Sequence, residues 1–344
     1  CEAVCPSGVR YGELVETARA QIRRSEAPDE RAKKGFASGA ARALFERPAL
    51  MRAAATLLRF AQRTRLIGLA NLFGLGRAAA LAPEISRRFF RAADQRYDAS
   101  MPQGLAFFHA GCIMPVAFAQ VHRATVRLLC RGQLSVVVPS DQTCCGAIAL
   151  HDGDFDFTRE LAKRNIAAFE RSNADVYVVN AAGCGSTLKE YGRLFAGDPE
   201  WAARAAAFSK RVRDVAEVLD ALDLGAPARS IDAIVTYQEP CHLAHAQRVA
   251  GAPRRLLARV PGLRFVEMDD SALCCGSAGL YNLTQPEMAD GLQRRKIEAI
   301  ERTGASVVVT ANPGCAAQVA AGLRDAKYSA TVKHVVELLD EAFC

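Results

Sequence analysis

The pattern of hydrophobic and polar positions changes at about residue 100 of this 344-residue chain. Before that point, apolar residues and arginines recur at helical spacing, as in residues 41–66, and β-branched runs are few. After it, short apolar runs alternate with amphipathic stretches of helical period. The first pattern predicts a helical region over residues 1–100. The second predicts α/β layers around a largely parallel sheet.

The strand and helix signals beyond residue 100 occur in the same order twice. Strands are predicted at GLAFFHA, QLSVVVP and DVYVVN, with helices at PVAFAQVHRATVRLLCRG and FTRELAKRNIAAFERS. Strands are predicted again at DAIVTYQ, LRFVEM and SVVVTAN, with helices at PRRLLARV and EMADGLQRRKIEAIER. The stretch EVLDALDLGAPARS, which ends at Ser230, separates the two halves. We therefore expect two homologous α/β domains, over residues 101–230 and 231–344.

The cysteines repeat with the same period. Each half contains a single cysteine, then a CCG pair, then another single cysteine, and corresponding cysteines are 129 to 131 residues apart. The first set is Cys112, Cys144, Cys145 and Cys184, and the second is Cys241, Cys274, Cys275 and Cys315.

Thiolates are ligands for zinc, copper or iron–sulfur clusters. A single zinc ion is usually held by short loops such as C-x2-C, which neither set contains, whereas adjacent cysteines suit a polynuclear cluster. Gly146 and Gly276 follow the pairs and allow the backbone to turn tightly there. The chain shows no secretory signal and no apolar run of about 18 residues, which favours a reducing compartment and metal-binding cysteines. Structural cysteines, vicinal disulfides and a zinc site remain as alternatives.

The N-terminal sequence CEAVCPSGV matches the end of the ferredoxin pattern C-x2-C-x2-C-x3-C-P. Cys1 would be the third cysteine of that pattern and Cys5 the fourth, and the two would serve different clusters. Because the chain begins with Cys1 and not with methionine, we expect that upstream residues supply the remaining ligands.

The other cysteines and the histidines give weaker signals. We expect Cys130 to be a small buried apolar residue, and assign no role to the terminal Cys344. His109 and His242 lie beside cysteines and are candidates for contact with a cluster. His245 is a weaker candidate for such contact. The remaining histidines, His122, His151 and His334, are interpreted as ordinary surface or helix residues.

The net charge of +7 comes from the N-terminal region. Residues 1–100 contain 18 Lys and Arg against 10 Asp and Glu, and the remaining residues contain 26 against 27. This excess is typical of a solvated helical face, or of a docking surface for an acidic partner or an anionic membrane. No aromatic-interleaved basic motif accompanies it, so nucleic acid is not an expected partner.

Together, AGC…CCGAIALHDG…NAAGCGSTLKEYG and EPCHLAHAQ…CCGSAGLYN…ANPGCAAQ resemble the iron–sulfur subunit of bacterial glycolate oxidase, over essentially the whole chain. The resemblance implies a helical ferredoxin-like remnant followed by two cysteine-rich CCG domains, and an electron-transfer subunit with [4Fe–4S] clusters. It implies flavin-containing partner subunits that carry FAD, oxidise glycolate to glyoxylate and send electrons toward the quinone pool. Since no secretory signal or membrane-spanning run is present, we expect a cytoplasmic protein, and the basic N-terminal region leaves a peripheral location on the inner face of the cell membrane as an alternative.

The resemblance carries the ferredoxin-type ligands over to Cys1 and Cys5, and the CCG ligands to the eight repeated cysteines. The fullest CCG pattern ends in C-x-x-C, and here Ala181 and Asn312 occupy the first of those positions. Each half thus offers four cysteines instead of five. Whether the CCG halves hold clusters, and of which type, stays open at this point.

The sequence contains no dinucleotide-binding G-x-G-x-x-G after a strand, no P-loop, no Ser-His-Asp arrangement and no H-E-x-x-H. We therefore expect no catalytic residue in this chain. We expect the chain to be a subunit of an oxidoreductase whose hydroxy-acid site lies on a partner subunit. Alternatives are the equivalent subunit of a lactate or glycerol-3-phosphate dehydrogenase, a heterodisulfide-reductase-like subunit, and a zinc-bound assembly module.

Overall fold

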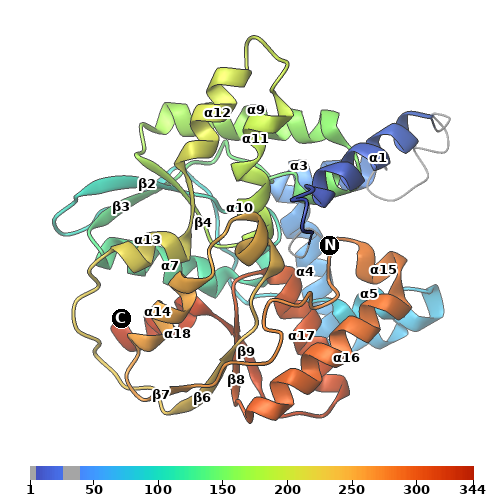
Figure 1. Cartoon of the computed structure of the whole chain (residues 1–344), viewed down its shortest axis with the longest axis vertical. Helices are drawn as coiled ribbons and strands as arrows, with labels where there is room; N and C mark the ends of the chain where they lie inside the picture. Colours follow the sequence, from blue (N-terminus) through green and yellow to red (C-terminus); the bar gives the residue numbers. More distant parts are fainter. Residues whose placement is uncertain (1–4, 26–38) are drawn as a thin grey trace.

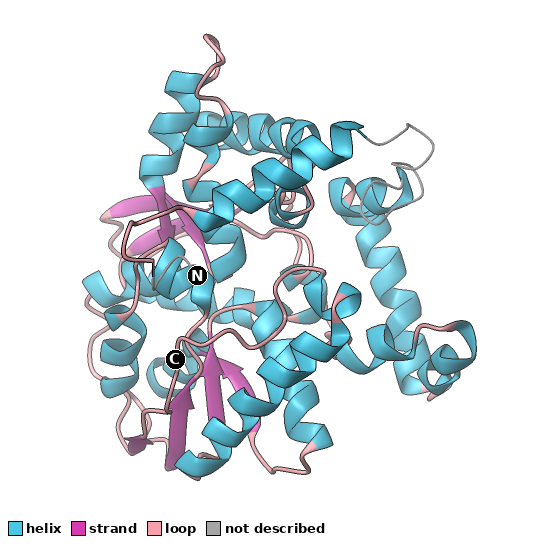
Figure 2. Ribbon diagram, turned by 45° about the vertical axis from the view of Figure 1, so that its right-hand side comes forward, coloured by secondary structure: helices cyan, strands magenta, loops and turns pink. Residues whose placement is uncertain are grey.

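The computed structural model describes residues 5–25 and 39–344, and Cys1 lies outside them. Figures 1 and 2 show two β-sheets surrounded by helices, and the strands of the two sheets follow one another along the chain. The predicted α/β class is confirmed. No helix among the described residues combines the length and the apolar character needed to cross a membrane.

The N-terminal region is helical as predicted in its described part as far as Leu81, but residues 82–100 are not helical and contain a short strand at Gln95–Tyr97. Pro48 occupies the first turn of its longest helix, where a missing N–H costs no hydrogen bond. A 3-10 helix follows, and it ends at Gly74 in the left-handed conformation. The elements are α1 (Tyr11–Ser25), α3 (Gly39–Glu46), α4 (Pro48–Arg63), η3 (Leu66–Phe73) and α5 (Gly76–Leu81).

The first sheet has the strand order β1-β3-β2-β4-β5. All neighbours are parallel except β1, which pairs antiparallel with β3 at the edge. Its strands are β1 (Gln95–Tyr97), β2 (Gly104–Phe108), β3 (Leu134–Val138), β4 (Val176–Val179) and β5 (Val212–Asp214). Its helices are α6 (Met114–Ala117), α7 (Ala119–Arg131), α8 (Ala147–His151), α9 (Phe155–Ser172), α10 (Ala182–Lys189), α11 (Tyr191–Leu194), α12 (Ala202–Arg211) and α13 (Val215–Ala221).

The second sheet is wholly parallel, with the order β7-β6-β8-β9. This order matches β3-β2-β4-β5 of the first sheet, so the repeat seen in the cysteines is also a repeat of topology. Its strands are β6 (Ala233–Tyr237), β7 (Leu263–Phe265), β8 (Val307–Thr310) and β9 (Thr331–His334). Its helices are η4 (His242–Ala246), α14 (Gly251–Ala258), α15 (Tyr281–Thr284), α16 (Pro286–Thr303), α17 (Pro313–Asp325) and α18 (Val335–Phe343).

The two halves share one hydrophobic core. Helices α7 and α13 of the first half pack against α18 and α14 of the second. Leu128 and Val215 lie in the same buried cluster as Leu256 and Leu338, and all four are fully buried. Because that core is continuous, the packing fixes how the two sheets face each other. The domain boundaries at residues 100 and 230 stay predictions.

Candidate functional site

One cavity of about 420 Å³ lies at the carboxyl ends of both sheets. In parallel sheets this is the edge where α/β folds place their functional loops. The cavity brings together all eight repeated cysteines, whereas Cys5 does not line it. The cysteines that line it are Cys112, Cys144, Cys145, Cys184, Cys241, Cys274, Cys275 and Cys315.

The local structure around each cysteine is the same in both halves. The first cysteine follows the central strand, and the CCG pair lies in the loop after the neighbouring strand. The last cysteine, Cys184 or Cys315, lies in the first turn of α10 or α17. Unpaired amides at a helix N-terminus favour an anionic thiolate. The fold therefore directs four thiols of each half to one place.

In the first set, the sulfur atoms of Cys112 and Cys144 are 3.5 Å apart. The backbone N–H of Gly146 donates to the sulfur of Cys144 at 3.4 Å. Gly146 has a φ of +82°, and a side chain at this position would lie 2.9 Å from Thr158. Glycine is required here because this turn aims an amide at the thiol.

The second set repeats this arrangement and adds two polar contacts. Gly276, with a φ of +91°, donates its N–H to the sulfur of Cys274 at 3.4 Å. The side-chain amide of Asn312 donates to the sulfur of Cys315, also at 3.4 Å. The sulfur of Cys241 lies 3.9 Å from Nδ1 of His242. Neutral donors of this kind stabilise a thiolate without neutralising it.

Close packing makes the thiols of each set unequal as acids. Hydrogen bonding with Cys145 lowers the pKa of Cys184 to about 6, although burial opposes the shift. Hydrogen bonding with Cys144 raises the pKa of Cys112 well above its usual value, and burial adds to the effect. Without a cation, neighbouring buried thiols cannot all ionise together.

The residues present fit a thiolate-bound metal group in each half. The cysteines that the structure describes are free thiols, and those around the cavity are buried or half-buried. The cavity volume is more than ten times the roughly 30 Å³ that one water occupies in the liquid. A metal centre would supply the positive charge that holds several thiolates close together.

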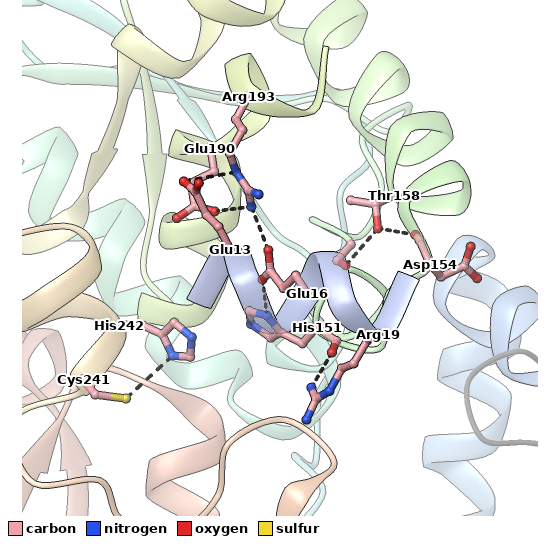
Figure 3. Close-up of polar contacts among 11 residues, drawn as sticks. Glu13, Glu16, Arg19, His151, Asp154, Thr158, Glu190, Arg193, Cys241 and His242 are labelled. Atoms are coloured by element: carbon pink, nitrogen blue, oxygen red, sulfur yellow. Dashed lines mark hydrogen bonds and ion pairs between the residues drawn. The ribbon is translucent and has the colours of Figure 1, made fainter. Parts of the chain in front are cut away.

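Figure 3 shows polar contacts between Glu16 of helix α1 and the side chains of His151 and Arg193, and His151 lines the cavity. Nδ1 of His151 lies 2.9 Å from the carboxylate of Glu16, which also accepts from Arg193 at 2.7 Å. Burial raises the pKa of Glu16, but the hydrogen bonds from His151 and Arg193 outweigh it, so that the pKa is lowered. The His151 ring stacks on His242 with centroids 5.4 Å apart. The interpretation of His151 as an ordinary residue was wrong, since both histidines line the cavity.

His122 lies on helix α7, as that interpretation allows, whereas His334 lies at the end of strand β9, and both are buried and not on the surface. Nε2 of His122 donates to Ala110 O at 2.8 Å, and its Nδ1 accepts from the side chain of Asn180 at 3.0 Å. Nε2 of His334 donates to Asn180 O at 3.0 Å, and its Nδ1 caps helix α18 at Val336. Burial lowers the pKa of His122 to about 3 and that of His334 to about 4. Both imidazoles are therefore neutral structural groups. Spacing along the sequence gave no sign of this, because the partners come from distant strands.

Direct contacts join the two halves beside the cysteines. The N–H of Gly183 donates to Oδ1 of Asn312 at 3.0 Å, and the N–H of Ala182 donates to Ala311 O at 3.0 Å. The side-chain amide of Gln247 donates to Ala182 O at 2.9 Å. The start of α10 is thus held by the second half of the chain, and this arrangement was not predicted.

Comparison with known proteins agrees with this architecture. The cysteine-rich domain family (CCG) matches residues 106–189 and again residues 235–320. A Bacillus subtilis chain named "probable glycolate oxidase iron-sulfur subunit" is 37% identical over 99% of this chain and 80% of its own length. Lactate utilization protein A of an Exiguobacterium strain is 30% identical over 67% of this chain and 94% of its own. A crystal structure of a hypothetical protein from Helicobacter pylori matches with a TM-score of 0.51 at 10% identity. It covers 74% of this chain and 52% of its own, and this likeness concerns the fold alone.

Proposed function

Because this chain belongs to the family of glycolate oxidase iron–sulfur subunits, we propose that it is the electron-transfer subunit of a flavin-linked dehydrogenase that oxidises glycolate to glyoxylate. The observation that carries the proposal is that eight cysteines, four from each half, line a single cavity. Two metal centres that share one cavity are suited to exchange electrons. A structural role for the cysteines would not require both sets to converge.

In this proposal each cysteine set holds one iron–sulfur cluster, of the [4Fe–4S] type, which supplies one-electron redox chemistry when bound. The chain supplies the ligands, the low-dielectric surroundings, and amides that donate to sulfur, from Gly146, Gly276 and Asn312. Cys1 and Cys5 would serve ferredoxin-type clusters. Backbone amides of Val9 and Ser7 lower the pKa of Cys5, which favours the thiolate that such a cluster needs.

The partner subunits would carry FAD and the site where the hydroxy acid is oxidised. The contacts from Glu16 through His151 to His242 link helix α1, which follows Cys5, to the cavity. These contacts would hold the ferredoxin-type region against the cysteine sets. Electrons would leave toward the quinone pool.

A lactate dehydrogenase subunit is the second candidate, because the chain is also similar to lactate utilization protein A. That similarity covers 67% of this chain, whereas the similarity to the Bacillus subtilis chain covers 99%. The extent of the similarity therefore favours glycolate. Turnover of glycolate, lactate and glycerol 3-phosphate by the complex with its flavin subunits separates the candidates.

An exposed apolar surface on the N-terminal region supports a location at the membrane. Its side chains are 48 to 78% exposed, and they come from the end of α4, from η3 and from the turn after it. This segment projects at the right-hand edge of Figure 1. The residues of this apolar surface are Leu57, Phe60, Leu66, Leu69, Leu72, Phe73 and Leu75.

The surroundings of this apolar surface are basic. Residues 47–91 contain nine arginines and one carboxylate, Glu84. An apolar surface with basic flanks is typical of a protein that lies on an anionic bilayer. We propose that this surface docks the protein on the membrane that holds the quinone pool.

The proposed function is tested with the anaerobically purified complex. Replacement of Cys145 or Cys275 by serine is expected to slow acceptor-linked glycolate oxidation, while glycolate still reduces the partner's flavin. The Cys130→Ser variant is the control, because Cys130 packs beside Tyr97 and away from the cavity. Unchanged turnover in both Cys145→Ser and Cys275→Ser would refute electron transfer through the cysteine sets.

A further inference from the structure

The first cysteine set has a histidine directly after its central strand, at a position where the second half of the chain has Gln238. His109 directly follows strand β2 and is 2% exposed. Its backbone N–H donates to Val178 O at 2.9 Å and so extends the pairing of β2 with β4. The imidazole therefore belongs to the rigid edge of the sheet and not to a mobile loop. It lines the cavity with the cysteines.

The two ring nitrogens of His109 have different surroundings. Nδ1 lies 2.7 Å from the hydroxyl of Tyr177, a fully buried residue on β4. Nε2 is buried and has no hydrogen-bond partner within the part of the chain that the structure describes. A buried polar nitrogen without a partner costs free energy, so its retention calls for an explanation.

The cysteines supply that explanation. A ring nitrogen of His109 and the sulfurs of Cys145 and Cys184 all lie within 4.8 Å of one another. Metal bonds to sulfur and to imidazole are roughly 2.0–2.3 Å long. A metal centre among these three atoms is therefore within reach of all of them after small movements. The Tyr177 hydroxyl can accept a hydrogen bond from Nδ1–H, which leaves the lone pair of Nε2 free to bind metal.

The second half shows what this position looks like without such a role. Gln238 occupies it, since its backbone N–H donates to Val309 O at 2.8 Å, as that of His109 donates to Val178 O. Its side chain donates to Glu239 O and accepts from the hydroxyl of Thr310, at 2.9 and 2.7 Å. Gln238 is thus satisfied by the protein and does not line the cavity. At this position the two halves therefore share the backbone pairing and differ in the side chain and in what it contacts.

We propose that Nε2 of His109 takes the place of one of the four neighbouring thiolates as a ligand of the metal centre in the first cysteine set, which makes that centre a mixed cysteine–histidine site. This rests on the proposed iron–sulfur function. The centre of the second set is bound by cysteine alone, with Asn312 as a hydrogen-bond donor to Cys315. A neutral imidazole donates less negative charge than a thiolate, so it raises the reduction potential of the centre that it binds. The two centres would therefore differ in potential, which gives electron flow through the shared cavity a direction.

The test is pulsed EPR of the reduced complex, purified anaerobically with natural-abundance histidine and with ¹⁵N-histidine. We expect a strong nitrogen coupling that changes with the isotope and is lost in His109→Cys. The control is His245→Gln, in which the coupling should persist because His245 is exposed. In His109→Cys, iron is retained and the midpoint potential of one centre shifts downward. Tyr177→Phe releases Nδ1 and is expected to change the size of the coupling with iron retained.

The outcomes separate the two claims. Suppose first that the wild-type complex contains iron and sulfide sufficient for both cysteine sets. The absence of a strong nitrogen coupling would then overturn the role of His109 alone. The same conclusion would follow if the coupling and the midpoint potential are unchanged in both His109→Cys and Tyr177→Phe. A wild-type complex with iron only in ferredoxin-type clusters would overturn both this role and the proposed function of the cysteine sets.

Discussion

The side-chain carbonyl of Asn312 accepts a hydrogen bond from the backbone N–H of Gly183 at 3.0 Å, across the boundary between the two halves. The amide nitrogen of the same side chain donates to the sulfur of Cys315. One carboxamide therefore positions the residue before Cys184 and also polarises a thiol of the other set. It stands where the fullest CCG pattern has another cysteine.

Substitution of Asn312 should separate these two roles. Asn312→Ala loses both hydrogen bonds, and we expect the free energy of unfolding to fall by roughly 1–2 kcal/mol. Because a donor to sulfur stabilises the more negative, reduced state, the midpoint potential of the second centre should also fall. Asn312→Asp keeps the acceptor for Gly183 but loses the donor, so it should lower the potential with a smaller loss of stability. Denaturant unfolding and a redox titration measure the two effects, and a potential that both variants leave unchanged would contradict this role.

Stability should depend on pH through the buried histidine His334. Burial lowers its pKa from 6.5 to about 4, so the unfolded chain binds a proton between these values and the folded chain does not. The stability that neutral His334 contributes is present above pH 6.5 and is lost as the pH falls toward 4. Asn is an effective helix cap, which makes His334→Asn the suitable variant. We expect the excess stability of the wild type over this variant to be about 2 kcal/mol smaller at pH 5 than at pH 7.5.

The measured quantity must be the difference in the free energy of unfolding between the wild type and His334→Asn, because another buried group changes stability with pH in the opposite direction. Burial raises the pKa of Asp214 to about 7, so its contribution falls as the pH rises from about 4 to about 7. Asp214 is unchanged in His334→Asn, and its effect cancels. Urea unfolding at the two pH values gives the result, and an excess that does not vary with pH would show that His334 is not held neutral.

The apolar surface should bind anionic vesicles. We expect the complex to float with phosphatidylglycerol vesicles and not with phosphatidylcholine vesicles, and to be released by salt, because arginines flank the surface. The double substitution Leu72→Glu and Phe73→Glu should weaken binding roughly 100-fold, since each buried side chain contributes about 1.5 kcal/mol. Met101→Glu is the control, because Met101 is equally exposed at 72% and lies outside this surface. Vesicle binding that survives the double substitution would refute the membrane role. If the double variant instead loses its association with the flavin subunits, the surface is a subunit interface.

The sequence predicted most of the fold because the signals are local. All six predicted strands are present, since runs such as VYVV and VVVT suit strands that are buried on both faces. The strands β1, β5 and β9 were not predicted, because each has only three or four residues and includes polar ones. A signal for two of them existed: Asp214 and His334 each precede a glutamate by three residues, which indicates a capped helix directly after a strand.

The sequence predicted the two sets of cysteines, but it did not predict that both sets line a single cavity. Spacing showed two cysteine sets, but their convergence depends on packing of α7 and α13 against α18 and α14, which no local pattern specifies. The environment of His151 was missed for the same reason, since its partner Glu16 lies 135 residues away. Long-range contacts of this kind follow from the whole core.

The most direct test of the account is an assay of iron and acid-labile sulfide, with low-temperature EPR of the reduced protein, on the anaerobically purified complex. Wild type, Cys145→Ser and Cys275→Ser are compared. The account predicts equal iron and sulfide in the wild type, and the loss of one distinct cluster signal in each variant with the other signal retained. Iron that accounts only for ferredoxin-type clusters, with the same spectrum in all three proteins, would contradict cluster binding by the two cysteine sets.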